Sequence, residues 1–370
     1  MKLFDTYRLI DRVIGSTLCI ILGGLTKLIP TIKRQPHRIL VVRLWGMGDA
    51  IVSLPVLKAL QDKYPNAKID VLCRRRNKSV FLNQDFVRKI LEFEYAQYVP
   101  LLLMFGRYDL VVDLEQYLNV SALLSWWLGR KRMGFSHGVR SLCYHETYDY
   151  SRSQHMLKNY LGIVGLVGAT YDKDHLLPLK VGKDAKDFVD KYMASWNLTD
   201  EDLKIGVQVC VAESGKTRLW TNEKFAKLCD KLVKKHRAKI IFVGGPVAVE
   251  ANDKVIQLME QKAYNCCAMS KRQAFEFFRR LNMVISLDTG PMHLGAAQGV
   301  PTVGIFGPNT PVLWAPYGSK NTVVYKKVSC SPCILNELGR MPVCERTKDK
   351  HICMKSIEPE DVSEAVEKIL

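Results

Sequence analysis

The stretch RILVVRLWGMGDAIVSLPVLKAL, at residues 38–60, indicates the fold class. Its first seven residues, RILVVRL, have the apolar centre that is typical of a strand buried in a parallel sheet. A glycine-containing turn, WGMGD, follows, and Ile51, Leu54, Leu57 and Leu60 then recur at the spacing of one helix face. A strand, a tight turn and a helix in this order predict the first unit of an α/β fold.

The same alternation continues along the chain. Further strands are predicted at residues 68–73, 108–114, 204–212, 239–245, 282–288 and 301–306, and further helices at 121–128, 221–236 and 359–370. Thr221 is expected to cap the second of these helices. Alternation with short connections predicts parallel sheets, and the length of 370 residues suggests about two domains. We therefore predict two Rossmann-like domains that face one another across a cleft, with the polar segment 170–185 as the crossing between them.

The net charge of +17 favours an anionic partner. Residues 1–180 carry an excess of +11 and residues 181–370 an excess of +6, with basic clusters at 33–38, 74–78 and 130–132. Nucleic acid, an anionic membrane, a phosphorylated acceptor and a simply solvated basic face are all consistent with this excess. No zinc-finger spacing, RNP motif or basic zipper accompanies the charge, so nucleic acid is not the expected partner.

The first 35 residues form a separate segment. Residues 13–29, VIGSTLCIILGGLTKLI, are apolar except for Lys27. This stretch is shorter than the roughly 20 apolar residues that a membrane span needs. No A-x-A cleavage site follows, so a cleaved signal peptide is not expected. Leu3, Tyr7, Ile10 and Ile14 recur at helical spacing. The segment is predicted to be a helix that lies either on a membrane or against the protein.

The turn after the first strand carries the first candidate for catalysis. Gly46 and Gly48 allow a substrate to approach the backbone closely, and Asp49 stands where the next helix begins. The amides and dipole at a helix N-terminus stabilise an ionised carboxylate, which could accept a proton from a hydroxyl group. The alternative is that Asp49 only caps the helix.

The block SLDTGPMHLGAAQG at residues 286–299 carries a second candidate site. A buried strand is expected to end at Asp288, and the amides of Thr289 and Gly290 would open the next helix, an arrangement suited to phosphate oxygens. His293 would lie within reach of the same anion. A generic strand-to-helix turn is the alternative.

Two further loops follow predicted strands of the second half. In ESGKTRLW, Lys216 and Arg218 could stabilise the charge of a diphosphate leaving group, although loop cations are often only solvated. In FVGGP, Gly244 and Gly245 would allow a nucleotide to approach, and Glu250 follows soon after.

Together, RLWGMGD, the K-x-R-x-W loop, the GGP turn and D-T-G-P-x-H-L-G-A-A resemble glycosyltransferase family nine in their order and rough spacing. This is the family of ADP-heptose:lipopolysaccharide heptosyltransferases, and the resemblance runs from about Arg38 to the C-terminus. YDLVVDLEQ and LLSWWLGRKRMGF resemble the family's acceptor domain. Leu219 and the displaced Glu250 depart from the family pattern.

The resemblance implies a GT-B fold and an inverting mechanism that needs no cofactor. It implies an acceptor-binding domain at 36–180, an ADP-sugar-binding domain at 181–358 and a C-terminal helix at 359–370. Asp49 would be the catalytic base. Donor phosphates would contact Arg218, Lys216 and the Asp288–Gly290 turn, with His293 close. The stretch Asp113-Leu114-Glu115 is interpreted as the end of a core strand rather than a metal motif.

We therefore expect transfer of a heptose, or a similar sugar, to the phosphorylated core of lipopolysaccharide. The expected location is cytoplasmic, peripheral on the inner face of the bacterial inner membrane. The rival hypotheses are a nucleotide-sugar epimerase of GT-B fold and a non-catalytic nucleotide-sugar-binding scaffold of envelope assembly.

The cysteines raise a separate question. Most of the eleven are scattered, as in a reduced cytosolic protein. In the loop at 330–353, however, four of them have the spacing C-x2-C-x10-C-x8-C: Cys330, Cys333, Cys344 and Cys353. Four thiolates could hold a structural zinc or iron ion, and reduced or disulfide-paired cysteines are the alternative.

Overall fold

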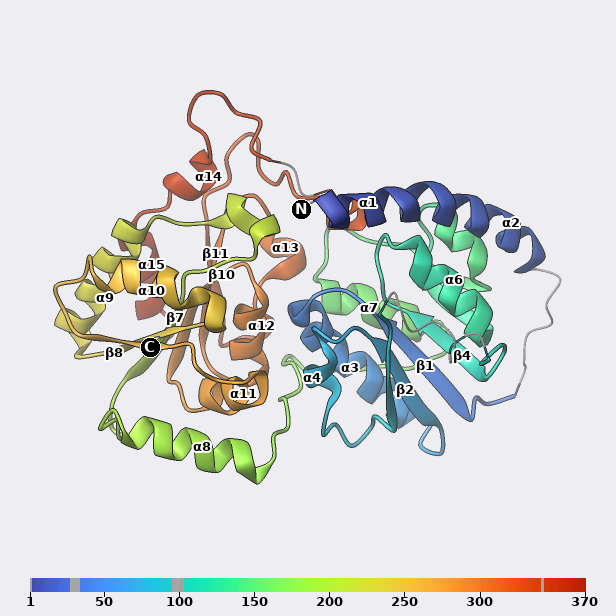
Figure 1. The fold of residues 1–370 in the computed structure, drawn as a ribbon, viewed down its shortest axis with the longest axis horizontal. Coiled ribbons are helices and arrows are strands. Elements are labelled where there is room, and N and C mark those ends of the chain that lie inside the picture. The colour runs from blue at the N-terminus through green and yellow to red at the C-terminus, as the bar shows by residue number, and fades with distance from the viewer. Residues whose placement is uncertain (1, 27–33, 95–100, 102, 341–342) are drawn as a thin grey trace. The chain divides into compact units, whose positions relative to one another are not determined.

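The computed structural model describes the chain except residues 1, 27–33, 95–100, 102 and 341–342 (Figure 1). It divides into two compact units. The first unit comprises Met1–Asp172 and Asn336–Gly339, and the second comprises Lys173–Leu335 and Arg340–Leu370.

A parallel six-stranded sheet forms the centre of the first unit, in the order β3-β2-β1-β4-β5-β6. The apolar run of β1 is buried on both faces, as the sequence predicts. Helix α6 packs on one face through Val120 and Leu124, whereas α3 and α7 pack against one another. The strands are β1 (Arg38–Arg43), β2 (Lys68–Cys73), β3 (Lys89–Glu92), β4 (Tyr108–Asp113), β5 (Gly129–Phe135) and β6 (Glu146–Tyr148). The helices are α3 (Met47–Lys63), α4 (Lys78–Phe81), α6 (Asn119–Leu128), η2 (Val139–Cys143), α7 (Met156–Gly165) and η5 (Asn336–Leu338).

The second unit repeats this topology, because its sheet has the order β12-β11-β10-β7-β8-β9 and all its strands are parallel. Thr221 caps α9 by accepting a hydrogen bond from the amide of Lys224, as predicted. The strands are β7 (Lys204–Gln208), β8 (Lys239–Val243), β9 (Ala263–Cys266), β10 (Met283–Leu287), β11 (Thr302–Phe306) and β12 (Thr322–Tyr325). The helices are α8 (Lys183–Ala194), η3 (Glu213–Arg218), α9 (Asn222–His236), η4 (Pro246–Ala248), α10 (Val249–Ile256), α11 (Lys271–Arg279), α12 (Gly290–Ala297), α13 (Pro311–Trp314), α14 (Ile352–Lys355) and α15 (Pro359–Glu367).

The N-terminal segment is a long helix that packs against the rest of the first unit. It consists of α1 (Lys2–Ile10), the π-helical turn η1 (Asp11–Gly15) and α2 (Ser16–Thr26). The carboxylate of Asp11 accepts hydrogen bonds from the amides of Asn119 and Val120, at 3.0 and 2.7 Å, and so caps α6. A Cβ atom at Gly23 would lie 2.4 Å from that of Leu142, so the glycine permits close contact with η2.

The opposite face of this helix is apolar and exposed. Leu9, Val13, Ile20 and Ile21 are each more than half exposed, at 61%, 57%, 54% and 58%. The stretch Thr6–Thr26 is long and apolar enough to cross a membrane by its length and composition. In the structure, one face of the helix packs against the rest of the first unit. Contact of the other face with a membrane stays a prediction.

The basic cluster at residues 130–132 does not form a uniform charged surface. Arg130 is exposed, but Arg132 is completely buried on β5. Its guanidinium donates to the carbonyls of Trp126 and Gly129, and burial lowers its pKa to about 10. This arginine therefore has a structural role in the fold.

Candidate active site

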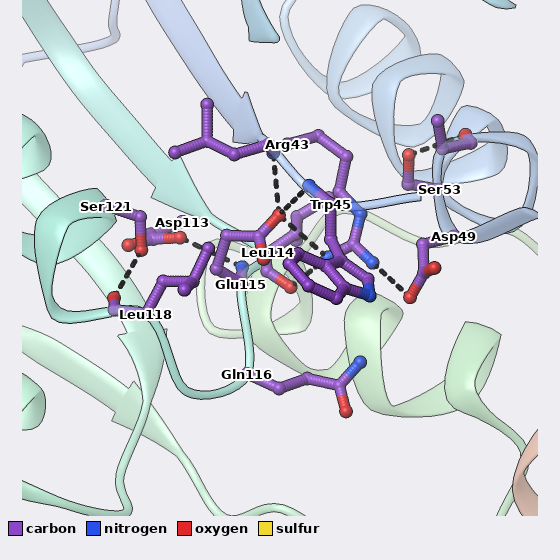
Figure 2. A network of polar contacts seen from close by, with 12 residues as sticks. Arg43, Trp45, Asp49, Ser53, Asp113, Leu114, Glu115, Gln116, Leu118 and Ser121 are labelled. Atoms are coloured by element: carbon purple, nitrogen blue, oxygen red, sulfur yellow. Dashed lines mark hydrogen bonds and ion pairs between the residues drawn. The ribbon is translucent and has the colours of Figure 1, made fainter. Parts of the chain in front are cut away.

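The candidate base lies at the switch point of the first sheet. In a sheet of this order, ligands bind beyond the carboxyl ends of the strands where the strand order reverses, here between β1 and β4. Glu115, in the loop after β4, accepts hydrogen bonds from the amides of Leu44 and Trp45, in the turn after β1, at 2.7 and 2.9 Å (Figure 2). The turn before α3 is thus fixed to the loop after β4.

Asp49 lies in the first turn of α3. The helix begins at Met47 with Gly46 as its N-cap, so Asp49 does not occupy the capping position. Its carboxylate accepts a hydrogen bond from Arg43 at 2.7 Å, and its side chain is 17% exposed. A Cβ atom at Gly46 would lie 3.0 Å from Asp49 Oδ2, so glycine leaves space beside the carboxylate, and Gly48 is buried in the first turn. The carboxylate is oriented and reachable from solvent.

Arg43 holds this carboxylate from a buried position at the end of β1 (Figure 2). Besides Asp49, its guanidinium donates to the carbonyl of Leu114 at 2.6 Å and to the hydroxyl of Tyr160 at 2.8 Å. The carboxylate of Glu115 lies 3.4 Å from the same guanidinium. Burial alone would lower the pKa of Arg43, but Tyr160, Glu115 and Asp49 raise it, so the guanidinium stays charged. Burial raises the pKa of Glu115.

The loop after β4 is held on its other side by Arg140, which is also buried. Arg140 donates to Asp113 at 2.9 Å and to the carbonyl of Glu115 at 2.6 Å, and the hydroxyl of Tyr144 donates to Asp113 at 2.7 Å. Asp113 and Glu115 therefore belong to a buried polar network. The interpretation of this stretch as a strand end is correct for Asp113, but it misses the part that Glu115 takes in the site.

The second unit has its candidate site at the matching switch point, between β7 and β10. Arg218, at the end of η3, forms an ion pair with Asp288 at 3.3 Å and also donates to its carbonyl at 2.9 Å. Asn309, which the sequence analysis missed, donates to the same carboxylate at 2.8 Å. The structure thus brings Arg218 and Asp288 together.

Helix α12 begins directly after this pair. Thr289 is its N-cap residue, Gly290 is its first residue, and the hydroxyl of Thr289 donates to Gln208 at 3.1 Å. Amides at a helix N-terminus favour an anion, and Arg218 adds a positive charge nearby. Gln208, which ends β7, is a second residue that the sequence analysis missed.

His293 is buried in α12, with its ring centroid 6.0 Å from that of Trp314. Its Nδ1 atom has no hydrogen-bond partner among the residues that the structure describes. Burial and the nearby Arg218 lower the pKa of His293 to about 4. The imidazole is therefore neutral near pH 7, and it could donate a hydrogen bond to an anion but would not add charge.

The remaining predicted donor residues lie in varied surroundings. Lys216 forms an ion pair with Glu213 at 2.6 Å and is 64% exposed, and Glu250 pairs with Lys254 at 2.7 Å and is 83% exposed. A Cβ atom at Gly244 would lie 2.5 Å from that of Ala248, so packing requires this glycine. At Gly245, a Cβ atom would meet nothing within 4 Å, so only this glycine of the pair borders open space.

The four C-terminal cysteines are free thiols in the structure. Burial, together with Cys330 and Cys344, raises the pKa of Cys333, and burial and the other three raise that of Cys353 to about 11. A hydrogen bond from the amide of His351 lowers the pKa of Cys344. Within the described part of the chain, no group of three or more His, Cys, Asp or Glu side chains is arranged to hold a metal ion. The structure therefore gives no support to a metal here, and the metal site stays a prediction.

Comparison with known proteins places this geometry in context. The family model of glycosyltransferase family 9 (heptosyltransferase) matches residues 103–339. Lipooligosaccharide heptosyltransferase 2 of Campylobacter jejuni is 22% identical, over 87% of this chain and 96% of that protein.

Two solved structures share the fold. A family 9 glycosyl transferase from Veillonella parvula has a TM-score of 0.75 at 23% identity, covering 92% of this chain and 98% of that chain. The E. coli ADP-heptose lps heptosyltransferase II has a TM-score of 0.69 at 19% identity, covering 90% and 98%. The predicted GT-B fold is thereby confirmed.

Proposed function

Because this chain belongs to glycosyltransferase family 9, the heptosyltransferase family, we propose that it transfers a heptose, or a similar sugar, from an ADP-sugar to the core oligosaccharide of lipopolysaccharide. The observation that carries the proposal is the pair of switch-point clusters. Asp49 is held by Arg43 in one unit, and Arg218 stands beside the N-terminus of α12 in the other. The first cluster suits a base, and the second suits a diphosphate.

In the proposed inverting mechanism, Asp49 accepts the proton of the acceptor hydroxyl as its oxygen attacks the anomeric carbon. The bond to the diphosphate breaks on the opposite face, and its electron pair leaves with ADP. Arg218 and the amides of Thr289 and Gly290 stabilise the charge that develops on the leaving group. The protein thus stabilises the leaving group with a guanidinium and backbone amides, and no metal ion is part of the proposal.

Asp288 would act through Arg218 in this mechanism. A carboxylate would repel a diphosphate, but here it accepts hydrogen bonds from Asn309 and pairs with Arg218, which it orients. Lys216 is largely exposed and already paired, so we expect it to contribute less than Arg218.

The test is an assay with purified protein, ADP-heptose and a phosphorylated core acceptor. We expect ADP release to match an acceptor mass gain of one heptose, with inversion at the anomeric carbon seen by NMR. A change of the ADP-sugar without acceptor would instead identify an epimerase. Tight ADP binding with no turnover on any core acceptor would favour a scaffold.

We further propose that the four C-terminal cysteines bind a structural zinc or iron ion, since their spacing allows four thiolate ligands. Protein purified under reducing conditions is expected to contain about one equivalent of metal by elemental analysis. The double variant Cys330→Ser/Cys333→Ser should lose it, whereas Cys210→Ser, outside the cluster, should keep it. A folded, metal-free preparation of the parent protein would refute this proposal.

We also propose that the protein is cytoplasmic and attaches peripherally to the inner membrane through its N-terminal helix. On binding, the exposed apolar face of the helix would be buried in the membrane. Each nearby basic residue, such as Arg12, would add about 1 kcal/mol of attraction to an anionic surface. Deleting the whole segment would remove the Asp11 cap from α6, so substitutions on the exposed face make a cleaner test.

The parent protein is expected to float with phosphatidylglycerol-containing vesicles at low salt, and the double variant Val13→Glu/Ile20→Glu should remain unbound. Leu166→Glu/Leu258→Glu, which charges exposed leucines elsewhere, is the matched control and should still float. Equal flotation of all three proteins, or of none, would show that the helix only docks against the protein.

A further inference from the structure

One cavity of the first unit lies against the N-terminal helix. It has a volume of about 270 Å³, and its lining includes residues of α1, η1 and α2, the turn after β1 and the loop after β2. Pockets for drug-sized ligands have roughly 300–1,000 Å³, so this cavity is suited to part of a larger ligand. It is a site that neither the proposed base nor the proposed donor residues use.

The walls of the cavity are mainly apolar. Ile14 and Leu18 line it from the helix, and Phe93 and Leu123 line it from the body of the unit. Ile14 and Leu18 are also 55% and 41% exposed, so the cavity is continuous with the apolar outer face of the helix. An apolar cavity that opens beside such a face favours an alkyl chain over a sugar.

Three arginines also line the cavity and give it a positive charge: Arg8, Arg74 and Arg76. The guanidinium of Arg76 lies over the ring of Trp45, 4.6 Å from its centroid, and Arg74 pairs with Glu94 at 3.2 Å. Burial and the neighbouring Arg74 lower the pKa of Arg76, whereas Glu115 and Asp49 raise it, so a bound anion would further stabilise the charged guanidinium.

Two carboxylates lie close to these three guanidinium groups: Asp11, whose oxygens accept hydrogen bonds from the amides at the start of α6, and Glu94, which pairs with Arg74, so the arginines remain in excess. An apolar wall beside clustered guanidinium groups matches a lipid that carries a phosphate, since guanidinium binds phosphate through paired hydrogen bonds.

We propose that this cavity binds the lipid end of the acceptor, with an alkyl chain against Ile14 and Leu18 and a phosphate against Arg74 and Arg76. The proposal rests on the proposed function, because it assigns the acceptor to the unit that contains Asp49. Trp45 connects the two sites, since it lines the cavity and belongs to the turn that leads to Asp49. The N-terminal helix then has two roles, as a membrane contact and as one wall of the lipid site.

The test is calorimetry with dodecyl phosphate below its micellar concentration, with inorganic phosphate and dodecyl maltoside as partial probes. We expect dodecyl phosphate to bind at least tenfold more tightly than either partial probe. The variant Ile14→Glu/Leu18→Glu should weaken its binding by more than tenfold. The matched control, Ile21→Glu/Leu25→Glu, charges exposed residues of the same helix that are not in the cavity lining and should bind normally.

The variant Arg74→Gln/Arg76→Gln separates the charge from the alkyl chain. It should weaken dodecyl phosphate binding and leave dodecyl maltoside binding unchanged. Equal binding of dodecyl phosphate by Ile14→Glu/Leu18→Glu and by its control, Ile21→Glu/Leu25→Glu, would overturn the proposal. It would show that the probe associates only with the helix surface.

Transfer to a deacylated, water-soluble core acceptor distinguishes this proposal from the proposed function. Normal transfer together with no dodecyl phosphate binding would overturn the lipid site alone. Binding of dodecyl phosphate in the cavity without transfer to either form of the acceptor would overturn the assignment of the acceptor.

Discussion

Asp49→Asn is expected to lower kcat by about a hundredfold or more while the affinity for the ADP-sugar stays unchanged. Asparagine has nearly the same shape, and its carbonyl oxygen can still accept the hydrogen bond from Arg43. The amide cannot accept a proton from the acceptor hydroxyl, so only the chemical step should suffer. Steady-state kinetics, with calorimetry of ADP binding, measures both quantities.

Asp62→Asn is the matched control for this prediction. It makes the same change of charge on the same helix, where Asp62 is exposed and paired with Lys58. Its kcat should stay within about twofold of the parent value, as expected for an exposed ion pair. If a folded Asp49→Asn variant transfers sugar at a similar rate to Asp62→Asn, then Asp49 is not the base.

The strands that the sequence predicts well are those whose apolar runs are buried on both faces. β2 matches its predicted bounds, β1, β4, β8, β10 and β11 match within two residues at each end, and β7 ends four residues before its predicted end. β5 was missed because its sequence, GRKRMGF, contains three basic residues, of which Arg132 is buried with backbone carbonyls and the His145 ring as hydrogen-bond partners. No local pattern reveals such a partner. β3, β6, β9 and β12 were also missed, and they are the short edge strands of the two sheets.

The candidate sites show the same division between local and long-range information. Asp49 and Arg218 could be found because they lie in loops that follow predicted strands, where α/β folds bind ligands. Glu115 could not be found in this way, because it binds the amides of Leu44 and Trp45 from about 70 residues further along the chain. The available signal was Arg43, a charge inside a buried apolar strand, since such a charge requires a partner.

Arg43→Lys is expected to lower kcat by about ten- to a hundredfold without changing ADP-sugar affinity. Lysine keeps the charge, but it cannot donate to Asp49, Tyr160 and the carbonyl of Leu114 in the fixed geometry of a guanidinium. The carboxylate of Asp49 would then lose its orientation, and a displacement of about 1 Å at a reacting group can cost a hundredfold in rate. Arg43 is thus a positioning residue that acts through Asp49.

A structural role must be separated from this effect, because Arg43 is fully buried. Removing one partner of a buried pair costs about 3–5 kcal/mol, and lysine, which retains the charge, should cost less. Arg140→Lys is the matched control, since Arg140 is equally buried and binds the same loop through Asp113 and the Glu115 carbonyl. Urea unfolding should show similar losses of stability for the two variants, while kcat falls further for Arg43→Lys. Parallel losses of stability and kcat in both variants would mean that Arg43 only supports the fold. A selective loss of kcat would show that the buried guanidinium sets the geometry of the base.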